Sequence, residues 1–150
     1  MGAVFFYHLT DSPLEATLPM LVGKARGAGW RVLVRSADDV LTKRLDDVMW
    51  QGPEDGFLPH GIAGGVYDAD QPVLIGDVPS DGFGCLMTVA GAAVSDSEVN
   101  ALERVCILFD GHDGVALDYA RGQWKALTDA GCSAQYWAQE DGRWTKKAEK

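Results

Sequence analysis

The sequence predicts an α/β fold: a single domain, residues 1–150, in which a mainly parallel sheet carries helices on both faces. Short runs rich in β-branched and aromatic residues alternate with segments whose apolar residues recur at helical spacing, which is the pattern of a parallel sheet. The length of 150 residues suits one ordinary domain. Neither an internal repeat nor a linker-like stretch divides the chain.

The first strand and helix are predicted near the N-terminus. The short run GAVFFYHL is rich in β-forming residues, as in a buried strand. Asp11 or Ser12 is expected to cap the helix that follows. Pro13 suits the first helical position, and Glu15 completes a capping box with Ser12. The apolar positions of this helix are Leu14, Leu18, Leu21, Val22 and Ala25.

A second strand, WRVLVRS, and a second helix come next. Asp38 or Asp39 is expected to cap this helix. Its apolar face carries Leu41, Leu45, Val48 and Met49. The segment QGPEDG then interrupts the chain, and FLPHGIAGGVYDADQ is glycine-rich and expected to be mostly irregular. His60 in this stretch has no partner at a motif spacing, so we interpret it as a residue that fixes its loop.

The second half of the chain predicts three buried strands, a long helix and a terminal hairpin. The strands are PVLIG, CLMTVAG and RVCILFDG, and SDSEVNALE forms a short helix or an irregular connection. The long helix is expected from Gly114 to Ala130, closed by Gly131. CSAQYWAQ and RWTKKA, separated by EDG, predict the hairpin. The tail KKAEK is expected to be frayed.

The composition argues against several classes of protein. A net charge of −9 and a pI near 4.6 oppose direct binding of nucleic acid or of an anionic membrane. No apolar run approaches the roughly 20 residues of a membrane span, and the N-terminus lacks a basic leader, so we expect a cytoplasmic protein. Cys85, Cys106 and Cys132 are far apart in apolar contexts, so we expect buried free thiols.

Signatures of catalysis and of cofactor binding are missing from the sequence. The turn LTDSP after the first strand has no glycine, and Asp11 within it would repel a phosphate. There is no Walker motif and no GxSxG elbow. Asp110, His112 and Asp113 lack a second set of ligands, so we interpret them as a turn that caps the next helix. We therefore expect no catalytic residue, no metal and no cofactor.

One helix face combines two cations with an aromatic side chain. Arg121 and Lys125 are one turn apart, and Trp124 lies between them. Two interpretations fit: Trp124 belongs to the core beside two solvated cations, or the three residues form a small basic-aromatic surface. Such a surface would suit a peptide that ends in a carboxylate and an apolar side chain, with Arg121 pairing with the carboxylate.

These segments together resemble the chi subunit of the bacterial DNA polymerase III holoenzyme. The similar pieces occur in family order over nearly the whole chain: FYHL, GWRVLVR, RLDDVMW, FLPHG, QPVLI, ERVCILFDG and ARGQWKALTDAG. The resemblance implies a Rossmann-like α/β fold without a phosphate-binding loop and without catalytic activity. It also implies an accessory role in the clamp-loader assembly during DNA replication, through binding of the acidic C-terminal tail of single-stranded-DNA-binding protein.

The resemblance also suggests which residues meet the partners. Arg121, Trp124 and Lys125 match the family positions that receive the tail. Leu117 stands one turn earlier, where the family has a further basic residue. Family members also bind a second subunit, psi, through an apolar surface. Because exposed aromatic clusters mark interfaces, our candidates for contact with psi or another clamp-loader component are Trp50, Phe57, Leu58 and Pro59.

The fold alone leaves one alternative function open. The same sheet could support a small-molecule or nucleotide-binding enzyme of unknown substrate. Such an enzyme would need a deep polar pocket at the carboxyl ends of the strands, where ligands bind in α/β folds.

Overall fold

The computed structural model describes residues 2–36, 38–50, 60–64 and 71–150. In chain order the elements are β1 (Ala3–Leu9), α1 (Leu14–Gly27), β2 (Val32–Arg35), α2 (Asp39–Trp50), β3 (Gly61–Ile62), β4 (Val73–Ile75), β5 (Cys85–Thr88), α3 (Asp96–Ala101), β6 (Arg104–Asp110), α4 (Gly114–Asp129), β7 (Ser133–Glu140) and β8 (Arg143–Glu149).

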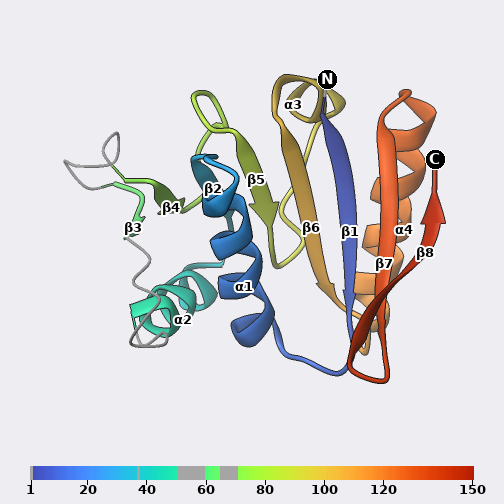
Figure 1. Cartoon of the computed structure of the whole chain (residues 1–150), viewed down its shortest axis with the longest axis horizontal. Helices are drawn as coiled ribbons and strands as arrows, with labels where there is room; N and C mark the ends of the chain where they lie inside the picture. The colour runs from blue at the N-terminus through green and yellow to red at the C-terminus, as the bar shows by residue number, and fades with distance from the viewer. Residues whose placement is uncertain (1, 37, 51–59, 65–70) are drawn as a thin grey trace.

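The strands form one sheet in the order β3-β4-β2-β5-β6-β1-β7-β8 (Figure 1). Neighbouring strands of the described residues pair in parallel, except that β7 and β8 form the antiparallel terminal hairpin. The predicted α/β fold with a mainly parallel sheet is therefore confirmed. β3 was not predicted: its two residues pair with β4 inside the stretch that was expected to be mostly irregular.

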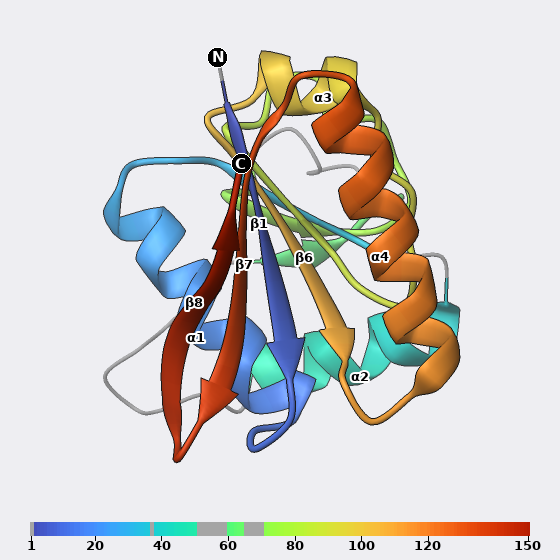
Figure 2. The same ribbon diagram turned by 90° about the vertical axis from the view of Figure 1, so that its right-hand side faces the viewer.

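Helices cover both faces of the sheet, as predicted. α1 and α2 pack on one face and α3 and α4 on the other. Figure 2 shows α1 and α4 on opposite sides of the sheet. Successive side chains of β2 point to opposite faces of the sheet. Val32 and Val34 therefore join the core under α1 and α2, while Leu33 joins the core under α3 and α4. All three side chains are fully buried, so a strand covered on both faces reads as a continuous apolar run. The three cysteines are buried free thiols, which confirms that prediction.

The start of α1 differs from the prediction. Pro13 is the N-cap residue of α1, and no side chain caps this helix, so the capping box between Ser12 and Glu15 is wrong. The Ser12 N–H instead donates to the side-chain oxygen of Gln139 on β7, 3.1 Å away. Glu15 pairs with Arg44 of α2 at 3.2 Å. Long-range contacts with the hairpin and with α2 thus replace the local cap that the sequence suggested.

The other helices begin as their sequences indicate. Asp38 caps α2, because its carboxylate accepts the N–H groups of the next residues. The segment SDSEVNALE does form a helix, α3, which starts with a complete capping box between Ser95 and Glu98. Asp113 caps α4 by accepting two backbone N–H groups of its first turn. The FDGHDG segment is therefore a helix-capping turn, as interpreted from the sequence.

A largely buried ion pair joins α3 to the sheet. The guanidinium of Arg35, at the end of β2, donates two hydrogen bonds to the two carboxylate oxygens of Glu98, at 3.0 and 2.7 Å. The Ser80 hydroxyl donates to the same carboxylate at 2.7 Å. Hydrogen bonding with Arg35 lowers the pKa of Glu98 to about 2, although burial opposes that shift. A bidentate pair of this kind fixes the position of α3 over the sheet.

The C-terminal tail is not frayed, contrary to the prediction. β8 extends to Glu149, and the N–H and carbonyl of Lys150 both bond to Ala134 of β7, at 2.9 and 3.1 Å. The ladder continues because it satisfies backbone groups of both strands almost to the last residue. The whole hairpin therefore belongs to the sheet.

Candidate functional site

The residues predicted to bind a peptide lie along one side of α4. We call Arg121, Trp124 and Lys125 the cationic flank. Trp124 is half-buried and packs edge-on against Phe6 of β1, with ring centroids 5.4 Å apart, and against Tyr136 of β7, at 6.0 Å. Contacts of this geometry hold the indole in one position. Trp124 thus contributes to the core and also forms part of the surface beside the two cations.

The two cations of the cationic flank are exposed, and each forms a solvent-exposed ion pair with a nearby carboxylate of α4. Arg121 Nη1 lies 3.9 Å from a carboxylate oxygen of Asp118, and both side chains are largely exposed. Lys125 Nζ lies 2.8 Å from a carboxylate oxygen of Asp129, and this hydrogen bond raises the pKa of Lys125. Exposed pairs contribute little stability because solvent screens them. An incoming carboxylate can therefore replace Asp118 or Asp129 at small cost.

A histidine and a tyrosine next to the cationic flank were missed by the sequence reasoning. His8 Nδ1 and the Tyr136 hydroxyl share a hydrogen bond of 2.8 Å between β1 and β7. Burial lowers the pKa of His8, and the charges of His112 and Arg121 lower it further. Burial also raises the pKa of Tyr136, and the charge of Arg121 opposes that rise. Arg121 thus acts electrostatically on both rings, which come from strands 128 residues apart in sequence.

Gly111 makes room for this pair. A Cβ at Gly111 would lie 2.0 Å from the ring of His8, far inside van der Waals contact. The Gly111 N–H also donates to the carbonyl of Leu9 at 2.7 Å, which brings the loop after β6 against the end of β1. The glycine of the FDGHDG turn is therefore explained by close packing and not by ligand binding.

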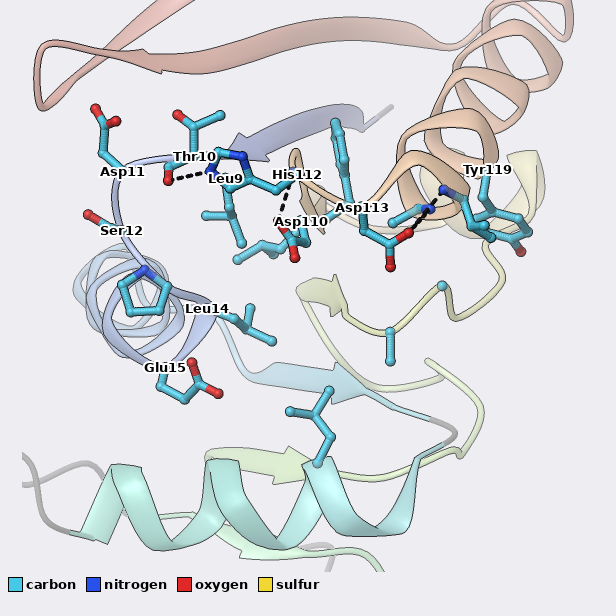
Figure 3. A pocket seen from close by; sticks show the side chains of 18 residues that line it. Leu9, Thr10, Asp11, Ser12, Leu14, Glu15, Asp110, His112, Asp113 and Tyr119 are labelled. Atoms are coloured by element: carbon cyan, nitrogen blue, oxygen red, sulfur yellow. Dashed lines mark hydrogen bonds between the residues drawn. The ribbon is translucent and has the colours of Figure 1, made fainter.

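A second feature is a cleft of about 810 Å³ at the carboxyl edge of the sheet. Its walls are the loops after β1, β5 and β6, the N-terminal parts of α1 and α4, and Leu41 of α2. Figure 3 shows Leu14 reaching from α1 toward this space, with Asp110 and Asp113 on the opposite side. We call it the carboxyl-edge cleft. It lies where ligands bind in α/β folds. The side chains and backbone groups that line it therefore test the alternative that the chain is a nucleotide-binding enzyme.

Three backbone amides of the turn before α1 already have an acceptor. The N–H groups of Thr10, Asp11 and Ser12 all donate to one side-chain oxygen of Gln139, at 3.2, 3.0 and 3.1 Å. A phosphate site at a helix N-terminus depends on such free N–H groups. Carboxylates also line the cleft, and they repel phosphate. The geometry therefore argues against a nucleotide in this position.

Comparison with protein families decides the assignment. The family described as "DNA polymerase III chi subunit, HolC" matches residues 1–135, which is most of the chain. The chain belongs to the DNA polymerase III chi subunit family. The resemblance read from the sequence is thus confirmed, and chi-family membership assigns the chain to DNA replication and to the polymerase III assembly. A search of curated proteins gives no match.

The chi-family match includes the whole cationic flank. It ends within β7, just before Tyr136, so Tyr136, Gln139 and most of the hairpin lie beyond the matched residues. In the described residues, no helix has the length and apolar character needed to cross a membrane. Among those residues, no group of three or more His, Cys, Asp or Glu side chains is arranged to hold a metal ion.

The candidates for a psi-facing surface lie mostly outside the described residues. Phe57, Leu58 and Pro59 fall in the undescribed segment, and Trp50 is the last residue of α2. His60 follows them directly and is buried. Its Nε2 lies 3.1 Å from a carboxylate oxygen of Asp46 on α2. His60 therefore anchors the chain to the helix that precedes the segment, in keeping with a structural role.

Proposed function

We propose that this chi-family chain is an accessory subunit of the clamp-loader assembly that binds the acidic C-terminal tail of single-stranded-DNA-binding protein. The tail docks on the cationic flank of α4, and the chain has no catalytic activity of its own. Such a subunit ties the replicase to coated template strands and works in the cytoplasm. Family membership supports the replication role.

The observation that carries this proposal is the pairing of two exposed cations with one fixed indole. Arg121 presents a guanidinium that can take a carboxylate in two parallel hydrogen bonds. Lys125 lies one turn further along and attracts the acidic residues that precede the terminus. Trp124 lies beside Arg121 on the side of α4 nearer the sheet, and its contacts with Phe6 and Tyr136 hold it in place, so an apolar terminal side chain finds a preformed partner.

The charge distribution affects both the association rate of the tail and the salt dependence of the complex. The net charge of −9 repels an acidic peptide at long range, so the association rate is lower than for a neutral protein. The complex depends on short-range pairing at Arg121 and Lys125, and added salt weakens it. Leu117, one turn before Arg121, is partly buried against the core and adds no charge to the site.

A second surface binds psi or another clamp-loader component in this proposal. Trp50, Phe57, Leu58 and Pro59 remain its candidate residues. Trp50 is the last residue of α2, and α2 packs on the face of the sheet opposite to α4 and its cationic flank. Two partners could therefore bind at once, which a subunit that links an assembly to coated DNA requires.

Fluorescence anisotropy with a labelled acidic peptide ending in Pro-Phe tests the proposal. The intact chain should bind with micromolar affinity. Arg121→Ala should weaken binding by about 1.5–3 kcal/mol, the usual contribution of a charge-assisted hydrogen bond. Arg44→Ala is the matched control, because Arg44 is similarly exposed and also holds one surface carboxylate. Equal affinities of the two variants would refute the assignment of the site.

A further inference from the structure

The carboxyl-edge cleft arises from the way the chain winds around the sheet. β1 and β6 are neighbours, but α1 leaves β1 over one face and α4 leaves β6 over the other. A space therefore opens between the two helix starts at the ends of these strands (Figure 3). Apolar side chains supply much of its lining: Leu9, Leu14, Leu41, Leu108, Phe109, Val115, Ala116 and Tyr119.

Part of this apolar lining faces solvent. Val115 is 81 % exposed and Tyr119 45 % exposed, and both belong to the flank of α4 that faces away from Arg121. Tyr119 lies over Gly91 in the loop after β5, 3.9 Å from the position of its missing Cβ. The chain thus holds a valine and a tyrosine in water at the mouth of an apolar cleft, as surfaces that receive a partner often do.

Apart from His112, the charged side chains that line the cleft are all carboxylates. Four carboxylates line it: Asp11, Glu15, Asp110 and Asp113. Hydrogen bonds to backbone N–H groups fix three of them, since Asp11 accepts from the hairpin, Asp110 from His112 and Asp113 from α4. Within the part of the chain that the structure describes, Glu15 is the one of the four that pairs with a cation, Arg44. None of the described lining residues is lysine or arginine, so the cleft favours cations beside its apolar surface.

We propose that the carboxyl-edge cleft docks a basic, apolar peptide segment of a partner protein. Apolar side chains of the segment enter between α1 and α4 and cover Val115 and Tyr119, while its lysines or arginines meet the carboxylates. The net charge of −9 disfavours a second copy of this chain as the occupant. The two flanks of α4 would then take partners of opposite charge, and this cleft does not depend on binding of the acidic tail.

The test uses a defined probe and the full-length chain. The probe is a short amphipathic peptide with leucines on one face and lysines on the other, and its comparison peptide has glutamates in place of the lysines. NMR chemical-shift mapping with the lysine peptide should show changes at residues 9–15 and 108–119. Isothermal titration should show binding of the lysine peptide, and the glutamate peptide should cause no shifts at residues 9–15 and 108–119.

Two matched variants separate docking in the cleft from general attraction to an acidic protein. Val115→Lys should weaken binding of the lysine peptide about tenfold or more, because like charges then meet at the mouth of the cleft. Val40→Lys adds the same charge at a valine of 79 % exposure outside the cleft, and it should change the affinity by less than about twofold. Arg121→Ala should also change the affinity for the lysine peptide by less than about twofold.

Several results would overturn the proposal. Equal losses in the Val115→Lys and Val40→Lys variants would mean that the peptide responds only to net charge. Shifts spread over the acidic surface, or no binding of the lysine peptide, would remove the cleft as its site. Self-association that Val115→Lys abolishes, measured by analytical ultracentrifugation, would assign the cleft to a second copy. None of these results bears on the acidic tail, which the Arg121→Ala measurement tests separately.

Discussion

Glu98→Gln removes the carboxylate that holds Arg35 against the sheet. The pKa of Glu98 falls from an ordinary 4.5 to about 2, mainly through its hydrogen bonds with Arg35. Each pKa unit corresponds to about 1.4 kcal/mol, so the interactions of the ionised Glu98 with Arg35, Ser80 and Ser95 together stabilise the fold by about 3 kcal/mol. Breaking a buried pair from one side costs a similar amount, because the remaining charge stays desolvated. We therefore expect Glu98→Gln to lower the free energy of unfolding by about 3 kcal/mol at neutral pH.

Urea denaturation followed by circular dichroism measures this loss, with Glu103→Gln as the control for one removed surface charge. The pKa is lowered on folding, so the contribution of Glu98 is fully present above pH 4.5 and disappears as the pH falls toward 2. The difference between wild type and Glu98→Gln should shrink over that window. A difference below about 0.5 kcal/mol at neutral pH, or one that does not change with pH, would refute the importance of the pair.

Two further predictions concern the ends of helices. Asp113→Ala should destabilise the fold by about 0.5–2 kcal/mol in thermal or urea unfolding because α4 loses its cap; Asp118→Ala, an exposed residue within α4, is the control, and equal stability of the two variants would contradict the capping role. Gln139→Met should cost about 1–3 kcal/mol because three backbone amides lose their acceptor. Gln139→Glu keeps an acceptor oxygen and should retain more stability than Gln139→Met; the reverse order would argue against this explanation.

The strands other than β3 and most helix starts were predictable because their causes are local. A continuous apolar run such as RVCILFD indicates a strand that is buried on both faces of the sheet. Asp38 and Asp113 cap helices by accepting backbone N–H groups from residues close to them in sequence. The start of α1 was not predictable, because Gln139 reaches it from the far end of the chain. The same holds for the tail, which is ordered by its pairing with β7.

In the candidate site, too, features with local causes were predictable and features that depend on long-range contacts were not. The spacing of Arg121, Trp124 and Lys125 on one helix face is written in the sequence, and so is their likeness to the chi subunit family. The contribution of His8 and Tyr136 depends on the pairing of β1 with β7, which no local pattern shows. The carboxyl-edge cleft depends on helices that leave neighbouring strands over opposite faces, a property of topology and not of any motif.

Docking of the acidic tail is tested most directly by NMR chemical-shift mapping on the isotope-labelled full-length chain. The tail peptide and a version without its terminal phenylalanine are titrated in parallel. We expect saturable shifts centred on residues 121–125 and on Tyr136, with affinity at least about tenfold lower for the shortened peptide, because it loses one buried aromatic side chain. Equal affinities of the two peptides, or shifts centred away from α4, would contradict the account.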